Sequence, residues 1–174
     1  MSADEQLLAS FLDDRSDAAF RALYERHAPA MYALAFRLMG GREADAADAL
    51  QDAWARAWLR LESFRAESSL RTWLCGFVVN CCRERFRGPM FEALPDEAAP
   101  SSSRELRLDL ERALASLSAG HRAVLVLHDI EGYTHREIAA VLDIDEGTSK
   151  SQLSRGRAAL RKRLTDSEVP HGRP

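Results

Sequence analysis

The stretch from Thr134 to Arg157 constrains the fold of this chain more than any other segment, because it predicts two helices separated by a tight turn. Glu137 follows Thr134 by three residues, which is the capping-box spacing that begins a helix. Asp143 can adopt the left-handed conformation that ends this helix, and Asp145 can cap the next one. The segment is therefore expected to form a helix–turn–helix.

The second of these helices is strongly basic. It holds no acid between Gly147 and Leu164, and its cations are Lys150, Arg155, Arg157, Arg161, Lys162 and Arg163. Its apolar stripe consists of Leu153, Gly156, Leu160 and Leu164. The opposite face carries Thr148, Ser151, Arg155 and Lys162, with Gln152 and Ser154 on the flanks. The net charge of the whole chain is −3, so any affinity for DNA must come from such a local patch. An ordinary amphipathic helix with a solvated basic side is the alternative.

The rest of the chain also has apolar residues at helical spacing and shows no alternation typical of strands. Helices are expected over residues 4–14, 17–39, 43–61, 70–87, 104–116, 121–131, 134–142 and 146–165. Pro29 is expected to break a helix or to lie in its first turn, and Gly40 to end one.

The expected fold class is all-α with two small helical domains. A stretch rich in Pro, Ser and acids, residues 88–104, predicts a flexible linker between them. The domains are expected to cover residues 1–87 and 105–165, and a loose tail to cover residues 166–174.

The third expected helix has an acidic side. Asp45, Asp48 and Asp52 recur at helical spacing, and Gln51 lies beside them. Carboxylates near a helix N-terminus complement the helix dipole, so a solvated acidic cap is one interpretation. A docking surface for a basic partner is the other.

A polar loop at residues 64–69 leads into the fourth helix, which Ser68 or Ser69 can cap. That helix ends in an arginine-rich cluster and also carries Trp73 and Phe77. Aromatic rings beside arginines suit single-stranded nucleic acid, where bases stack on rings. The alternative is that both rings belong to the core.

Several function classes find no support in the sequence. Cys75, Cys81 and Cys82 are too poorly placed on one helix for a disulfide, and are expected to be buried or half-buried, reduced thiols. No metal-binding cluster, cofactor motif, or nucleophile with its base is found, which predicts a protein that is not an enzyme and needs no cofactor. No apolar run could span a membrane and no signal peptide is found, which predicts a cytoplasmic protein.

Taken in order, these segments resemble an extracytoplasmic-function (ECF) sigma factor, the minimal group of bacterial RNA polymerase sigma subunits. The resemblance covers residues 17–87, including Asp48-Ala-Leu-Gln-Asp-Ala-Trp54, and residues 113–164, including Gly147-Thr-Ser-Lys-Ser151. It implies sigma region 2 in residues 1–87 and sigma region 4 in residues 105–165. The implied function is to direct core polymerase to specific promoters and initiate transcription.

The resemblance also implies a role for particular residues. Docking on the clamp coiled coil of the polymerase β′ subunit falls to Asp48, Gln51 and Asp52. Recognition of the −10 element falls to Phe64, Arg65, Ser68, Ser69, Arg71, Asn80, Arg83 and Arg87. Recognition of the −35 element falls to Thr148, Lys150, Ser151, Gln152, Arg155, Arg157 and Lys162. Further implied partners are the polymerase β flap and an anti-sigma factor, since no extra control domain follows.

The sequence departs from the family pattern at some of these positions. Gln152 stands where the family usually has Arg, and Gln favours adenine where Arg favours guanine. Asp143 stands where the turn usually has Gly. Two other functions remain open: a helix–turn–helix repressor or activator that binds an operator alone, and a nucleic-acid-modifying enzyme with a helix–turn–helix appendage. A complex with core polymerase would separate all three.

Overall fold

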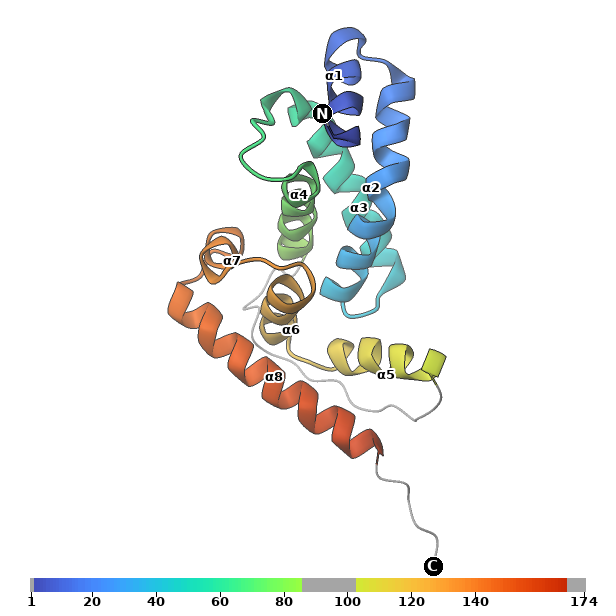
Figure 1. Ribbon diagram of the computed structural model, residues 1–174. Helices are drawn as coiled ribbons and strands as arrows, with labels where there is room; N and C mark the ends of the chain where they lie inside the picture. The colour runs from blue at the N-terminus through green and yellow to red at the C-terminus, as the bar shows by residue number, and fades with distance from the viewer. Residues whose placement is uncertain (1, 86–102, 169–174) are drawn as a thin grey trace, which may run out of the picture.

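The computed structural model describes residues 2–85 and 103–168, and all regular structure within these ranges is helical (Figure 1). The N-terminal domain contains α1 (Ala3–Asp14), α2 (Asp17–Leu38), α3 (Glu43–Arg60), a 3₁₀ turn (Leu61–Ser63) and α4 (Leu70–Arg85). The C-terminal domain contains α5 (Ser103–Ala115), α6 (Ala119–Leu125), a π-helical turn (Val126–Ile130), α7 (His135–Leu142) and α8 (Glu146–Glu168). The all-α class with two helical domains is confirmed. The expected linker falls almost entirely outside the described residues.

α2 continues through Pro29, so the expected break is wrong. Pro29 lies on the exposed face of the helix. The carbonyl of Glu25, which loses its helical partner at a proline, belongs to an exposed residue and can bond to water. Ala28 and Met31 are buried on the other face, and their packing keeps the helix intact. The helix ends before Gly40, whose φ of 68° matches the predicted stop.

Aromatic rings from α1, α2 and α3 form one part of the N-terminal core. The ring of Phe20 meets the indole of Trp58 edge-on, with centroids 4.3 Å apart, and Phe11 meets the same indole at 4.9 Å. Such perpendicular pairs add stability beyond the burial of their area. They fix α3 with its apolar stripe inward, which leaves Asp48 and Asp52 exposed on its outer side.

The helix–turn–helix forms as its sequence predicts. The hydroxyl of Thr134 accepts from the Glu137 N–H at 3.3 Å, and the Glu137 carboxylate accepts from the Thr134 N–H at 2.8 Å. These bonds from Thr134 lower the pKa of Glu137. Asp143 has a φ of 58° and ends α7 in the left-handed conformation. Gly156 lets α8 approach α6 closely, since a Cβ there would lie 3.1 Å from the carbonyl oxygen of His121.

The two domains pack against each other, which the sequence did not predict. α7 contacts α4, and α6 contacts α2, while α8 lies on the side of α6 and α7 that faces away from the N-terminal domain (Figure 1). Among the contacts between domains is an ion pair of 3.0 Å between Arg37 and Glu111. Within the described ranges, no helix combines the length and apolarity needed to cross a membrane.

Candidate nucleic-acid interface

The outer side of α8 is the most basic exposed face of the helix–turn–helix. Five of the residues predicted for the −35 element are exposed there: Lys150, Ser151, Arg155, Arg157 and Lys162. Thr148 is half-buried. The opposite side of the helix buries Leu153 and packs on α6 and α7. α8 therefore offers its polar side outward, the arrangement in which a recognition helix enters the major groove.

Gln152 is placed differently from the other predicted −35 residues. Its side chain is buried with 8% exposure, and its Oε1 has no hydrogen-bond partner among the described residues. Ser149, one turn earlier, is also fully buried and bonds to His135 at 2.9 Å. The buried side of α8 is thus wider than its apolar stripe, because two polar residues belong to it. The role of Gln152 in base reading stays a prediction, and it requires the amide to leave this buried position.

Arg157 forms an ion pair with an acidic residue of its own domain, Asp129. Its guanidinium donates to both carboxylate oxygens of Asp129, at 2.9 and 2.5 Å. This bidentate contact, together with the hydrogen bond from His128, lowers the pKa of Asp129. Asp129 lies in the π-helical turn and Arg157 lies in α8, so this ion pair also connects the two elements.

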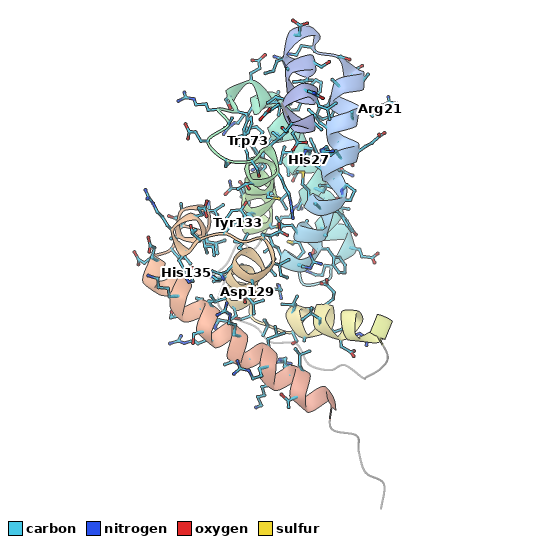
Figure 2. All side chains as sticks on the ribbon, viewed as in Figure 1. Arg21, His27, Trp73, Asp129, Tyr133 and His135 are labelled. Atoms are coloured by element: carbon cyan, nitrogen blue, oxygen red, sulfur yellow. The ribbon has the colours of Figure 1, made fainter. Side chains whose placement is uncertain are left out.

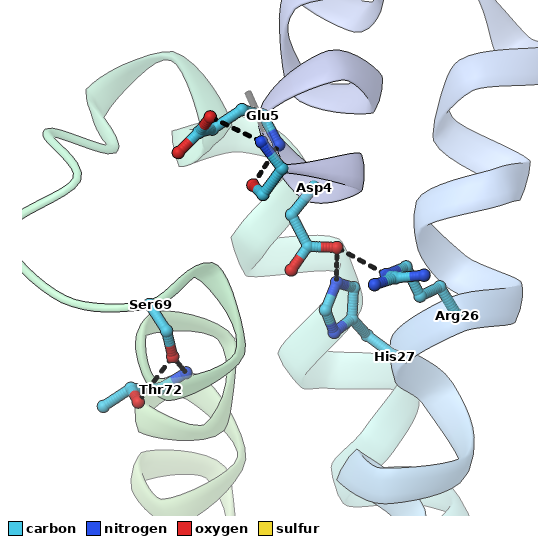
Figure 3. A network of polar contacts seen from close by, with 7 residues as sticks. Asp4, Glu5, Arg26, His27, Ser69 and Thr72 are labelled. Carbon is cyan, nitrogen blue, oxygen red and sulfur yellow. Dashed lines mark hydrogen bonds and ion pairs between the residues drawn. The ribbon is translucent and has the colours of Figure 1, made fainter.

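The loop before α4 is exposed along most of its length. Arg65 and Ser68 are exposed, and Phe64 is half-buried with its ring 5.5 Å from that of Trp73. Ser69 rather than Ser68 caps α4, since its hydroxyl accepts from the Thr72 N–H at 3.1 Å (Figure 3). The cap fixes where the loop ends and leaves its polar side chains open to a ligand.

Trp73 packs as a partly buried core residue. Its ring lies 4.7 Å from the ring of Phe77 and contacts the hydrophobic core. Both rings stand on the same side of α4, one turn apart. This packing favours the structural interpretation of the two rings over a base-stacking platform.

The predicted −10 residues on α4 differ in their surroundings. Arg71 is paired at 2.7 Å with Glu131 of the C-terminal domain. Asn80 and Arg83 are half-buried. Arg87 lies outside the described residues.

The acidic side of α3 faces an arginine, which the sequence reasoning missed. Arg85, at the end of α4, lies 2.6 Å from the carboxylate of Asp52 and 3.8 Å from that of Asp48. Gln51 is exposed beside them. The three predicted docking residues therefore lie on one exposed surface, and the two acids among them share the cation of Arg85. All three remain accessible, and a basic partner would have to compete with Arg85.

The three cysteines are buried and reduced in α4, as predicted. Burial raises the pKa of Cys75 to about 11 and that of Cys82 to about 12, and it also raises the pKa of Cys81. The thiolate forms needed for oxidation or metal binding are thereby disfavoured. In the described ranges, no cluster of three or more His, Cys, Asp or Glu residues could hold a metal ion.

Comparison with known proteins identifies the family. The model of the Sigma-70 region 2 family matches residues 23–88, and that of Sigma-70, region 4, matches residues 107–160. The ECF RNA polymerase sigma factor SigM of Mycobacterium tuberculosis H37Rv is 36% identical over 170 residues, covering 93% of this chain and 85% of the relative. The ECF RNA polymerase sigma-E factor of Escherichia coli K12 is 28% identical over 177 residues, covering 90% and 92%.

Solved structures agree with this assignment. CnrH, solved in complex with the cytosolic domain of CnrY, has a TM-score of 0.64 and 31% identity, covering 97% of this chain and 100% of the other. The sigma factor RpoE of Bartonella quintana, solved with the anti-sigma factor NepR, has a TM-score of 0.62 and 28% identity, covering 84% and 96%. The chain belongs to the ECF sigma factors of bacterial RNA polymerase, which direct the core enzyme to promoters and initiate transcription.

Three residues of the C-terminal domain that join it to the N-terminal domain were not predicted from the sequence. Arg122 donates to the carbonyl of Leu38, Tyr133 donates to the carbonyl of Thr72, and Glu131 pairs with Arg71. Figure 2 labels Tyr133 between the two domains. No local pattern marks these residues, because each contact spans at least 60 positions of the chain.

Proposed function

We propose that this sigma factor reads its promoters at two points, with α8 at the −35 element and the loop of residues 64–69 with α4 at the −10 element. The exposed basic side of α8, on a well-capped helix–turn–helix, is the observation that carries the proposal. Arginine and lysine contacts to phosphates would position each domain, and a few side chains would specify bases. Arg155 is the main candidate for a base contact, since it is exposed in the first half of the helix.

The proposed −10 site combines the exposed loop with the arginines that follow it. Arg65 and Ser68 are open to a flipped base or its phosphate, and the Ser69 cap holds the loop against α4. Phe64 and Trp73 form its partly buried wall. Basic side chains on an exposed loop suit single-stranded DNA, because they can hold its phosphates.

The proposed polymerase contact is the acidic surface of Asp48, Gln51 and Asp52 on α3. These residues are exposed, and the aromatic core behind them holds the helix rigid. A basic surface on the β′ clamp coiled coil would complement them, and the C-terminal domain would contact the β flap. The proposed role is to bind and position, while the polymerase supplies the chemistry.

We also infer control by a separate anti-sigma protein. The similar RpoE of Bartonella quintana was solved with the anti-sigma factor NepR, which supports this inference for a chain that is 28% identical to it. Such a partner would act by covering the polymerase surface or the DNA surface.

Transcription by purified components tests the proposed function. Core polymerase is mixed with the chain, complex formation is followed by gel filtration, and the complex is supplied with a library of random upstream sequences. The expected result is a stable complex whose transcripts begin downstream of two shared sequence blocks. Failure of the chain to join core polymerase, or start sites that do not differ from those of core polymerase alone, would contradict it.

A further inference from the structure

Two histidines of the C-terminal domain stack against each other beside α8. The ring centroids of His128 and His135 lie 4.7 Å apart, and the ring planes differ by 30°. His128 belongs to the π-helical turn, and His135 is the first residue of α7. His135 and Asp129 are labelled in Figure 2, near the place where α8 passes α6 and α7. Neither histidine is among the residues assigned to polymerase or DNA.

Each ring is bonded to a residue of α8, directly or through one acid. Nδ1 of His135 lies 2.9 Å from the hydroxyl of Ser149, which is fully buried near the start of α8. Nδ1 of His128 donates at 2.8 Å to the carboxylate of Asp129, since a carboxylate only accepts, and Asp129 also accepts from Arg157. The stack therefore connects two points of α8 that lie about 12 Å apart along the helix.

Two separated attachments fix the direction of a helix, whereas a helix held at one point can swing about it. The attachment at Arg157 also orients its guanidinium without using all of it. The bonds to Asp129 involve Nε and Nη2, so Nη1 can still donate to a phosphate, and the side chain is 50% exposed. The stack thus acts on α8 and on an arginine that the proposed function assigns to the −35 element.

The charges around the stack favour neutral rings. The charged side chains of α8 that act on His135 are Lys150, Arg157 and Glu146. Glu146 already pairs with Lys150 at 3.7 Å, and Asp129 of the π-helical turn pairs with Arg157 at 2.5 Å. Both acids are engaged by cations of α8, so two charged imidazoles in contact would repel each other without full compensation.

Protonation of His135 is opposed in the folded protein. Burial lowers the pKa of His135, and His128 and Lys150 lower it further, against a smaller opposite effect of Glu146. The unfolded chain takes up this proton at the usual pKa of 6.5, so the contribution to stability is present above pH 6.5 and is lost as the pH falls below it. While the ring is neutral, either Nδ1 or the Ser149 hydroxyl can donate, but a protonated ring can only donate.

We propose that the neutral stack of His128 and His135 is a positioning element of region 4, which sets the direction of α8 and the orientation of Arg157 for reading of the −35 element, and that protonation of the stack loosens both. This proposal rests on the proposed function, which assigns α8 to that element. Acid then weakens sequence-specific binding, while the added positive charge strengthens binding to any DNA. The ratio of affinities for a specific and a scrambled sequence separates the two effects, because the general charge effect cancels in it.

The test measures binding of the polymerase holoenzyme to two duplexes at about pH 7.5 and at about pH 5.5, on either side of the histidine range. One duplex carries the −35 block recovered by the promoter selection, and the other has this block scrambled. We expect the affinity ratio to fall about threefold to tenfold at the lower pH, the effect of losing roughly one hydrogen bond.

The decisive variant combines His128→Asn with His135→Asn. An asparagine amide can take the place of Nδ1 in both hydrogen bonds, but it does not titrate in this range. Its affinity ratio should therefore be the same at both pH values. His135→Ala, which removes the bond to Ser149, should instead lower the ratio at both pH values.

His121→Asn is the matched control, because His121 is a half-buried histidine of the same domain outside the stack. This variant should keep the pH dependence of the native chain. Three results would each overturn the positioning role: a native ratio that does not change with pH, a pH dependence that persists in the double asparagine variant, or one that disappears with His121→Asn.

NMR titration of the imidazole protons separates failure of this proposal from failure of the proposed function. In the free chain, the pKa of His135 should lie below 6.5 and should rise when His128→Asn removes the stacked ring. If it does so and the affinity ratio is close to one at every pH, α8 does not read this block, and the positioning role falls with the proposed function. If the ratio is large but the pKa of His135 is not lowered or does not respond to His128→Asn, only the stack is wrong.

Discussion

Arg122 of α6 donates from Nε to the main-chain carbonyl of Leu38, 3.2 Å away in the other domain. Its Nη1 donates at 2.9 Å to the carbonyls of Ala115 and Leu117. Leu38 is the last residue of α2 and Ala115 the last of α5, so one guanidinium joins the C-terminal ends of two helices. Helix C-termini carry partial negative charge, which stabilises the cation there. Burial lowers the pKa of Arg122 to about 10, which still leaves it charged at neutral pH.

We predict that Arg122→Met destabilises the protein although methionine is apolar and of similar length. Three carbonyls lose their donor, two of them in buried contacts and that of Ala115 in a partly buried one, and the expected loss in free energy of unfolding is about 2–4 kcal/mol. Urea unfolding followed by circular dichroism measures it. Arg21→Met, on the exposed face of α2, is the control and should change stability by less than about 0.5 kcal/mol. Similar urea midpoints for the two variants would show that the hydrogen bonds of Arg122 contribute nothing to stability.

The role of Arg122 could not be read from the sequence, whereas that of Thr134 could. The capping box of Thr134 and Glu137 needs residues only three positions apart, so local spacing predicts it. The contact of Arg122 with Leu38 spans 84 positions and depends on how two separately patterned domains meet. It also needs Gly40, since a Cβ there would lie 3.0 Å from the Arg122 Nη1.

In the candidate sites too, local spacing predicted some features, whereas contacts between distant segments could not be predicted. Helical spacing placed Asp48 and Asp52 on one exposed face of α3, but it could not reveal that Arg85 reaches them from α4. Spacing also placed Gln152 at the edge of the polar face of α8, where its polarity argued for exposure. The structure buries it, because packing of α8 against neighbouring helices covers more than the apolar stripe.

We predict that Asp48→Arg combined with Asp52→Arg abolishes binding to core polymerase and leaves the fold intact. Reversed charges facing a basic partner should cost about 2–5 kcal/mol of binding free energy. The fold loses only exposed ion pairs with Arg85, which contribute about 0–1 kcal/mol. Pull-down of core polymerase measures the binding, and circular dichroism checks the helices.

The control for this charge reversal is Asp13→Arg combined with Glu25→Arg. Both positions are exposed in the N-terminal domain and the net change in charge is the same. This variant should bind core polymerase as the native chain does. Undiminished pull-down by the Asp48 and Asp52 variant would remove the docking role from α3.

We predict that the three cysteines react slowly with iodoacetamide in the folded protein. With a pKa of about 11, the Cys75 thiol is deprotonated in about one molecule in a thousand at pH 8, and Cys82, at about 12, in fewer still. Mass spectrometry of quenched samples measures the rate of alkylation. Unfolding in urea exposes the thiols and should raise this rate. Rapid alkylation of the folded chain would contradict a purely structural role for the three cysteines. So would transcription that responds to an oxidant in the native protein but not in the variant with alanine at all three positions.

The same burial predicts how stability changes with pH. The folded state holds the protons of Cys75 and Cys82 more tightly than the unfolded chain, whose thiols titrate near 9.0. The contribution is therefore fully present below pH 9.0 and is lost as pH rises toward the folded pKa values of about 11 and 12. Urea midpoints measured across this range should fall for the native chain. They should fall less for the variant with alanine at both positions.

We predict that Arg155 and Lys162 contribute to DNA binding in different ways. Both are exposed on α8, but Arg155 lies nearer its N-terminal half, which enters a major groove most deeply. Arg155→Ala should cost about 1–3 kcal/mol on the preferred promoter and relax sequence preference at one position. Lys162→Ala should weaken binding to all promoters alike and lower the slope of log K against log salt by about one.

A series of promoters with single changes in the −35 element, bound by the polymerase holoenzyme, tests this difference. Gln152→Ala belongs in the same series, because a base contact by Gln152 would change preference at a second position, whereas a buried amide would change only stability. Ala158→Ser, an exposed neutral change on the same helix, is the control. Equal weakening of every promoter by Arg155→Ala would make Arg155 a phosphate contact like Lys162, and base reading by α8 would then have to be assigned to its remaining exposed residues.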